Sequence, residues 1–352
     1  MEYFFIFCFS ALLLCTLIGD VAAKKYILPI FIAILLLYFG FRDGYGTDYP
    51  NYIAMAEILK YQPDLSYVGG EIGFRTLILL FNSLGLPSYT ILFASFSISI
   101  LCISFASYRF SPSVTLSFVV IFGFGFLFAS FNIVRQALAF SIICSLLVLI
   151  EKEKYFKFII CSIVVGVLIH KTAILLAVLP FLRFLKLQAK TWSVFLFSSI
   201  VLMQVSQWLF SLMQGFLSKD WFAYAHYFDS EWAIVSRNNT YLNLIIGLII
   251  GIWIISRVDW FNSSVFNRII FNAYLIGFCV HVIFINIQAF NRMALIFTWF
   301  SFLVVPMAIM SYKRESNRLI ASAGLIAYTI VISWVSVSSH MQNFDIGNHL
   351  FP

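Results

Sequence analysis

Charged and amide side chains gather in an early polar stretch of this chain, where they could recognise an anionic, hydroxyl-rich substrate. The sequence FRDGYGTDYPNY at 41–52 places Arg42, Asp43 and Asp48 beside two glycines and three tyrosines. Charged residues at the edge of a membrane segment usually have a function, because burying charge there is costly. The glycines let the backbone bend, so we expect a polar site here at the bilayer surface.

Two triplets later in the chain combine one arginine with two side-chain amides. They are Asn132, Arg135 and Gln136 in FNIVRQALAF, and Gln288, Asn291 and Arg292 in NIQAFNRMAL. Residues spaced i, i+3 and i+4 share one face of a helix. A guanidinium flanked by amides can bind phosphate or pyrophosphate through parallel hydrogen bonds. A single arginine could instead extend its charge to lipid headgroups, but two matching triplets favour a ligand site.

The segment VLIHKTAILL contains the histidine best placed for acid–base chemistry. Histidine titrates near neutral pH, so His170 could act as a general base or could be a structural hydrogen-bonding residue, and both interpretations stay open. The neighbouring Lys171 adds a positive charge. We interpret His281, in a later apolar segment, as structural.

Membrane-spanning helices must position these residues. Of 352 residues, 62% are hydrophobic and only 11% are charged, which is too little polar surface for a water-soluble globule. We therefore predict an all-α polytopic integral membrane protein, a single multi-spanning domain over 1–352 with about twelve transmembrane helices. The expected spans are 3–19, 26–41, 88–107, 113–131, 133–150, 155–170, 172–185, 191–213, 241–256, 268–288, 292–310 and 318–338.

The distribution of lysine and arginine predicts the orientation. Most of them mark one side, which is therefore cytoplasmic, and both termini lie on the other side. The cytoplasmic set is Lys24, Lys25, Arg109, Lys152, Lys154, Lys157, Arg183, Lys186, Lys190, Arg257, Arg268, Lys313, Arg314 and Arg318. The assignment requires that 71–84 is a re-entrant or surface helix and not a span. The short segments 155–170 and 172–185 indicate a local break near His170.

The longest polar loops, 42–70 and 214–240, fall on the outer side. The second loop mixes tryptophan, tyrosine and acidic residues, as sugar-binding surfaces do, although an aromatic belt at the membrane interface is the commoner cause. The chain has no P-loop, GxGxxG, HExxH or Cys/His metal spacing. We expect no metal, no cofactor and no nucleic-acid partner, and a substrate that arrives already activated in the membrane.

Five motifs in order carry a resemblance to a known family. They are R-D-G-x-G-x-D-Y-x-x-Y (42–52), E-x-G-F (71–74), I-V-R-Q-x-L-A (133–139), V-x-x-H-K-T-A (167–173) and N-R (291–292). From the first helix to about residue 310 the chain resembles the EpsG-type, Wzy-like polysaccharide polymerases.

The resemblance implies a GT-C-like, metal-independent membrane glycosyltransferase of the bacterial inner membrane. It would polymerise O-antigen of lipopolysaccharide, or another surface polysaccharide, at the periplasmic face. Donor and acceptor would both be oligosaccharides linked to undecaprenyl pyrophosphate within the membrane lipid, and chain-length control would need a co-polymerase as partner.

Roles for individual residues follow from the needs of glycosyl transfer. Cations must neutralise the departing diphosphate, and a base must act near the acceptor hydroxyl. We assign Arg135 and Arg292 to the pyrophosphate, with Arg42 as a third candidate, and His170 or Asp48 to the hydroxyl, with His170 favoured. Further substrate contacts are assigned to Asp43, Tyr49, Tyr52, Glu71, Asn132, Gln136, Lys171, Gln288 and Asn291.

Two other functions fit parts of the pattern. A flippase of lipid-linked oligosaccharide would need a charged path through both leaflets, whereas the inner helix halves carry almost no charge. An O-antigen ligase would have a longer late periplasmic loop than 214–240. A structural channel subunit is the remaining alternative.

Overall fold

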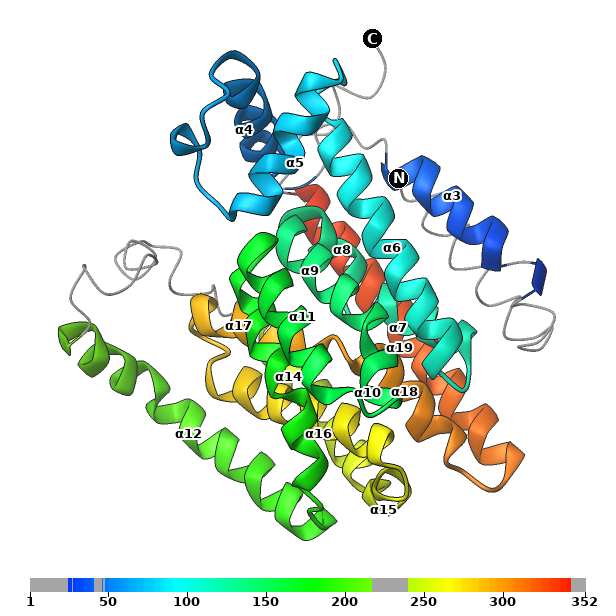
Figure 1. Cartoon of the computed structure of the whole chain (residues 1–352). Helices are drawn as coiled ribbons and strands as arrows, with labels where there is room; N and C mark the ends of the chain where they lie inside the picture. The colour runs from blue at the N-terminus through cyan, green and yellow to red at the C-terminus, as the bar shows by residue number, and fades with distance from the viewer. Residues whose placement is uncertain (1–24, 27, 41–45, 47, 217–239, 343–352) are drawn as a thin grey trace. The chain divides into compact units, whose positions relative to one another are not determined.

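The computed structural model describes residues 25–26, 28–40, 46, 48–216 and 240–342, and these residues form helices and no strand (Figure 1). The result confirms the all-α prediction. Apolar runs fold as helices because lipid offers no partner for backbone N–H and C=O groups. The expected span 3–19, Arg42, Asp43 and most of the loop 214–240 lie outside the described residues.

The chain divides into two compact units, which we describe separately. Unit 1 comprises Met1–Ile174 and Val305–Pro352, and unit 2 comprises Leu175–Val304. The single domain expected from the sequence stays a prediction.

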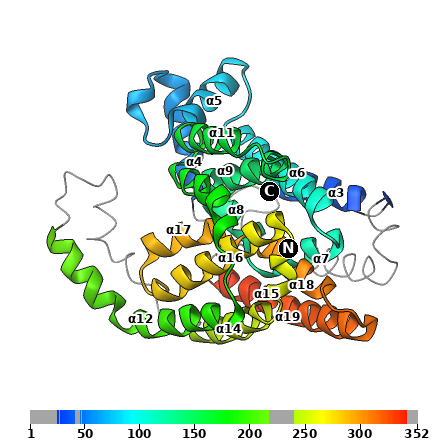
Figure 2. The ribbon, with the colours of Figure 1, turned by 60° about the horizontal axis from the view of Figure 1, so that its bottom comes forward.

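Unit 1 is a bundle around α6 (Thr90–Phe110) and α9 (Val134–Ser145), which lie side by side (Figures 1 and 2). Helix α3 packs against α6, α11 against α9, and α19 against α7. Its core contains almost fully buried phenylalanines, among them Phe96, Phe118 and Phe140. The helices are α3 (Leu28–Gly40), α4 (Tyr49–Tyr61), η2 (Leu65–Tyr67), α5 (Ile72–Ser83), α6 (Thr90–Phe110), α7 (Val114–Gly123), α8 (Phe126–Asn132), α9 (Val134–Ser145), α10 (Leu147–Glu151), α11 (Tyr155–Leu168) and α19 (Glu315–Gln342).

Unit 2 is built around α16, which packs against α17 and α12 (Figure 1). The 3-10 helix η3 leads into this unit and α18 leads back out of it. The elements are η3 (Lys171–Phe184), α12 (Ala189–Phe216), α14 (Thr240–Ile255), α15 (Val258–Asn262), α16 (Val265–Ile283), α17 (Gln288–Thr298) and α18 (Ser301–Met310).

Every expected span within the described residues coincides with a helix or a pair of helices. Of the described helices, four are long and apolar enough to cross a membrane, or five if the pair α17 and α18, bent by 41°, forms one span. The total of twelve spans and the GT-C-like arrangement stay predictions.

Three expected helices are interrupted. The segment 133–150 forms α9 and α10, with a turn at Leu146 between them. The segment 113–131 is interrupted at Gly125, whose φ of 81° lies in the left-handed region that glycine adopts without strain. The segment 292–310 is bent between α17 and α18. The break predicted near His170 is confirmed, since α11 ends at Leu168 and η3 begins at Lys171.

The segment 71–84 forms a helix of 12 residues, α5, which begins immediately after Glu71. Twelve residues rise about 18 Å, which is less than the hydrocarbon thickness of a bilayer. This length agrees with the expectation that α5 does not span. Its placement at the surface or in a re-entrant loop stays a prediction.

Candidate functional site

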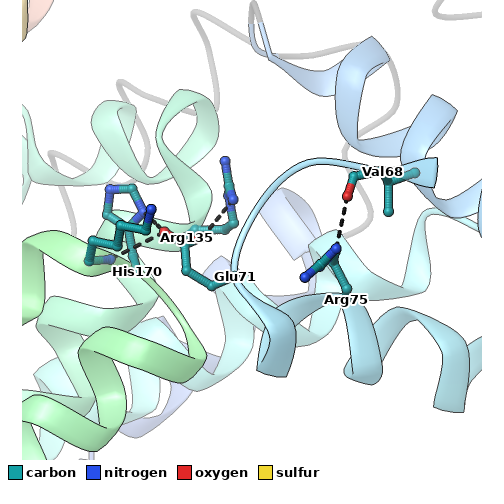
Figure 3. Close-up of polar contacts among 6 residues, drawn as sticks. Val68, Glu71, Arg75, Arg135 and His170 are labelled. Atoms are coloured by element: carbon teal, nitrogen blue, oxygen red, sulfur yellow. Dashed lines mark hydrogen bonds and ion pairs between the residues drawn. The ribbon is translucent and has the colours of Figure 1, made fainter. Parts of the chain in front are cut away.

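Three helix ends in unit 1 bring a carboxylate, a guanidinium and an imidazole together (Figure 3). Glu71 precedes α5, Arg135 lies in the first turn of α9, and His170 follows α11. We call Glu71, Arg135, His170 and Lys171 the Glu71 cluster.

The Glu71 carboxylate accepts hydrogen bonds on both oxygens. Arg135 Nη1 donates to Oε2 at 2.6 Å, and Oε1 lies 3.0 Å from His170 Nδ1 and 3.2 Å from the backbone nitrogen of Lys171. Only 6% of Glu71 is exposed. A buried carboxylate is tolerated when its lone pairs are satisfied in this way.

These partners decide the ionisation of Glu71. Burial by itself would raise the pKa of this carboxyl, but the hydrogen bond from His170 and the positive charge of Arg135 outweigh it and lower the pKa to about 2. The carboxylate is therefore charged at neutral pH, so the His170 Nδ1 that faces it must carry a proton. In the neutral imidazole the lone pair then belongs to Nε2.

Residues of the E-x-G-F motif allow these helix ends to approach. A Cβ on Gly73 would lie 2.6 Å from the carbonyl oxygen of Leu168, so only glycine lets α5 pack this closely against the end of α11. The guanidinium of Arg135 lies over the Phe74 ring, 6.0 Å from its centroid. The motif thus supplies the carboxylate, the close approach and an aromatic support for Arg135.

Gly70 makes room for Arg135 from the other side. Its φ of 107° lies in the region that favours glycine, and a Cβ here would collide with Arg135 Nη1. Arg75 shapes the same loop, because its Nη1 donates to the carbonyl oxygen of Val68 (Figure 3) and also to that of Leu65. Sequence reasoning gave none of Gly70, Gly73, Phe74 and Arg75 a site role, although a glycine pair before an acid and an apolar helix was a usable signal.

Tyr52 of α4 lies next to the cluster. Its side chain is buried, and its ring centroid is 5.8 Å from that of Phe74. Burial raises the pKa of Tyr52; Arg135 opposes this effect through its charge and a hydrogen bond, while Asp48 reinforces it. The structure therefore brings Tyr52 beside Arg135 and Asp48 near Tyr52, and both residues were predicted from the first motif.

The first motif (42–52) also contacts the first triplet (Asn132, Arg135 and Gln136), through Gly46. Gly46 has a φ of 114°, and a Cβ on it would lie 2.7 Å from the Phe131 carbonyl oxygen and 3.2 Å from Asn132 Oδ1. Tyr49 begins α4 shortly afterwards.

The prediction that the first triplet shares a face of one helix is wrong. Asn132 ends α8, whereas Arg135 and Gln136 belong to α9. The helix breaks at Ile133, whose ψ of 56° is not helical. Gln136 is buried, with 3% of its surface exposed.

The second triplet lies in unit 2, at the start of α17. The spacing of Gln288, Asn291 and Arg292 falls within this one helix, as predicted. Asn291 Oδ1 is 2.5 Å from His281 Nδ1, so His281 holds this amide in place, in agreement with the structural interpretation. Arg292 is partly exposed.

A second arginine–glutamate pair marks the opposite end of the bundle in unit 1. Arg109, in the last turn of α6, binds Glu151, the last residue of α10, with a shortest distance of 2.9 Å. Arg135 and Glu151 lie near the two ends of the segment Val134–Glu151, which α9 and α10 form together. This separation agrees with the predicted assignment of Arg109 and Arg135 to different sides.

The arrangement can perform acid–base and electrostatic chemistry. An imidazole held by a carboxylate can accept a proton at its other nitrogen, and an adjacent guanidinium can interact with an anion. In the part of the chain that the structure describes, no group of three or more His, Cys, Asp or Glu side chains could hold a metal ion.

A family model described as the EpsG family matches residues 25–348 of the chain. The matched segment contains the Glu71 cluster and Arg292. Neither a curated protein nor a solved structure matches the chain.

Proposed function

Because this chain belongs to the EpsG family, a family of Wzy-like polysaccharide polymerases, we propose that it is a membrane glycosyltransferase that polymerises lipid-linked oligosaccharide repeat units. The product is O-antigen or another surface polysaccharide, made at the periplasmic face of the bacterial inner membrane. The match over nearly the whole chain carries this proposal. The Glu71 cluster supports it by supplying a base and a cation in one place.

In the proposed reaction, the glycan on undecaprenyl pyrophosphate is the donor and the end of a fresh lipid-linked unit is the acceptor. The acceptor oxygen forms a bond to the anomeric carbon. The bond from that carbon to the pyrophosphate oxygen breaks, and its electron pair leaves with undecaprenyl pyrophosphate. Positive side chains lower the barrier by stabilising the charge that develops on the diphosphate.

We assign this electrostatic role to Arg135 and Arg292. Arg135 is held by Glu71 in the same cluster as His170, so its positive charge lies close to the proposed base. Arg292, at the start of α17, follows an amide that His281 orients. Lys171, whose side chain is exposed, and Arg42 are further candidates for phosphate contact.

His170 is the proposed base. Its Nδ1 faces a carboxylate, which leaves Nε2 to take the proton of the acceptor hydroxyl as the new bond forms. About 15% of its side chain is exposed, so a substrate can approach it. Asp48 remains the alternative base, and Asp43 and Tyr49 are proposed sugar contacts, whereas Tyr52 is as deeply buried as Glu71 and supports the cluster from behind instead.

Deletion of the gene, scored by gel electrophoresis of surface polysaccharide, tests the function. Loss of the long-chain ladder with retention of a one-unit product identifies a polymerase. Complete loss of surface units identifies a flippase or a ligase and overturns the proposal.

Complementation of the deletion with His170→Ala, Arg135→Ala and Arg292→Ala tests the assigned roles. Each variant should abolish long chains while the single-unit substrate accumulates. Arg109→Ala is the matched control, because this arginine also binds a glutamate but lies at the other end of the bundle. Normal ladders in Arg135→Ala and Arg292→Ala together would refute the pyrophosphate assignment.

A further inference from the structure

The carboxylate in the middle of the site has no role in the proposed transfer. Glu71 was expected to contact sugar, yet its two oxygens accept hydrogen bonds from Arg135, His170 and the backbone of Lys171. With 6% of the residue exposed, little of the carboxylate surface remains for a sugar hydroxyl.

From this geometry we infer that Glu71 is a positioning residue, which fixes the tautomer and orientation of His170 and holds Arg135 beside it. The inference rests on the proposed function, because it assigns the means by which the proposed base is prepared for the reaction.

Glu71 is itself a poor base. A carboxylate with three donors and a pKa of about 2 takes a proton from a hydroxyl far less readily than an imidazole does. The geometry gives it a different use: it accepts a hydrogen bond from the protonated Nδ1 of His170, which leaves the lone pair on Nε2 for the acceptor hydroxyl. Its negative charge also stabilises the imidazolium that forms when His170 takes the proton.

The contacts with Arg135 and Lys171 make this arrangement stiff. Arg135 Nη1 binds Oε2 while His170 and the Lys171 amide bind Oε1, so rotation of the carboxylate would break all of these bonds. The groups that face the imidazole–carboxylate pair are therefore Arg135 on α9 and the Lys171 amide, with Tyr52 next to Arg135 and Asp48 near Tyr52. One side chain thereby sets the distance between the base and the cation.

The variant that tests the inference is Glu71→Gln, assayed in purified enzyme with lipid-linked repeat units. The glutamine amide can donate to His170 Nδ1 and so favour the tautomer that has its proton on Nε2. General-base catalysis contributes roughly 100-fold or more, so we expect kcat to fall by about that factor with little change in KM. Loss of the negative charge should also move the acidic limb of the pH–rate profile to lower pH.

Glu57→Gln is the matched control. Glu57 is a partly buried glutamate of the same unit, and it accepts a hydrogen bond from Ser88 outside the cluster. This variant should keep kcat within about twofold of the wild-type value. Glu71→Asp keeps the negative charge on a shorter side chain, so it should lose rate but retain the wild-type pH limb, and it serves if Glu71→Gln does not fold.

A double-mutant cycle between Glu71 and His170 best distinguishes a positioning role of Glu71 from a sugar contact. In a His170→Ala background, Glu71→Gln should lower kcat by much less than in the wild-type background, because the base that it positions is gone and only its support of Arg135 is left to lose. An equal loss in both backgrounds would overturn the inference, as would an increase in KM with unchanged kcat, which indicates a sugar contact. If wild-type enzyme makes no polymer, the proposed function fails instead, and the two failures are thereby separate.

Discussion

The bundle of unit 1 contains two arginine–glutamate pairs in opposite settings. Between Arg135 and Glu71 the carboxylate side chain is 4% exposed, and between Arg109 and Glu151 it is 35% exposed. The exposed pair has more contacts, with three nitrogen–oxygen distances of 2.9–3.2 Å. The buried pair has one contact between the two side chains, but it also includes His170.

From this difference we expect burial, more than the number of contacts, to set how much each ion pair contributes to the free energy of unfolding. An exposed pair is screened by water and contributes about 0–1 kcal/mol. Removal of one partner from a buried pair leaves an uncompensated charge and costs about 3–5 kcal/mol. We therefore expect the two ends of the bundle to respond very differently to the same substitutions.

The largest effect is expected from Arg135→Ala. It leaves the buried Glu71 carboxylate without its cation, so the free energy of unfolding should fall by about 3–5 kcal/mol and polymerisation should be lost. Thermal unfolding in detergent and the polysaccharide ladder measure the two effects. Unchanged unfolding would show that Glu71 is not held as a buried charge.

Acidification should remove a comparable contribution to the free energy of unfolding, because it protonates the Glu71 carboxylate. The pKa of Glu71 is about 2 in the folded protein and 4.5 for a glutamate free of these contacts, so this stabilisation is fully present above pH 4.5 and is lost as pH falls toward 2. A shift of this size corresponds to on the order of 3 kcal/mol. Thermal unfolding measured from pH 6 to pH 3 should show a decline that is flatter in Glu71→Gln, and equal slopes would contradict the assignment to Glu71.

A smaller effect is expected from Gly70→Ala. The substitution strains a residue with a φ of 107° and places a methyl group against Arg135 Nη1, at a cost of about 1–3 kcal/mol. Gly69→Ala is its matched control, because a Cβ on Gly69 would meet nothing within 4 Å. Equal melting temperatures for the two variants would show that Arg135 does not need the space that Gly70 provides.

The smallest effect is expected from Arg109→Ala at the exposed end. It should change the free energy of unfolding by less than about 1 kcal/mol and leave the ladder intact. If its cost matched that of Arg135→Ala, burial would not explain the difference between the pairs.

A second comparison, between the two arginine triplets, shows where prediction from spacing reached its limit. The triplets have the same spacing, but the second lies in one helix and the first is divided by the break at Ile133. Arg135 acquires a buried acid as its partner, whereas Asn291, the amide beside Arg292, is held by the histidine His281. Identical spacing therefore led to two different local environments.

The sequence by itself determined that the chain is all-helical and where the polar motifs lie along it. Long apolar runs admit no other backbone structure in lipid, and for this reason the expected spans within the described residues coincide with helices. The break near His170 was also predictable, because the apolar segments on either side of it are short.

Only the tertiary structure decided that Glu71 is the centre of the site. Glu71 lies 64 residues before Arg135 and 99 before His170, and periodicity reports on neighbours along one helix, not on the meeting of three helix ends. The three helix ends can meet because Gly73 packs closely against Leu168 and Gly70 leaves space for Arg135. Both contacts join residues far apart in the sequence, so spacing along the chain does not reveal them. The sequence predicts that Glu71 contacts sugar, but in the folded protein its carboxylate is bound by Arg135 and His170.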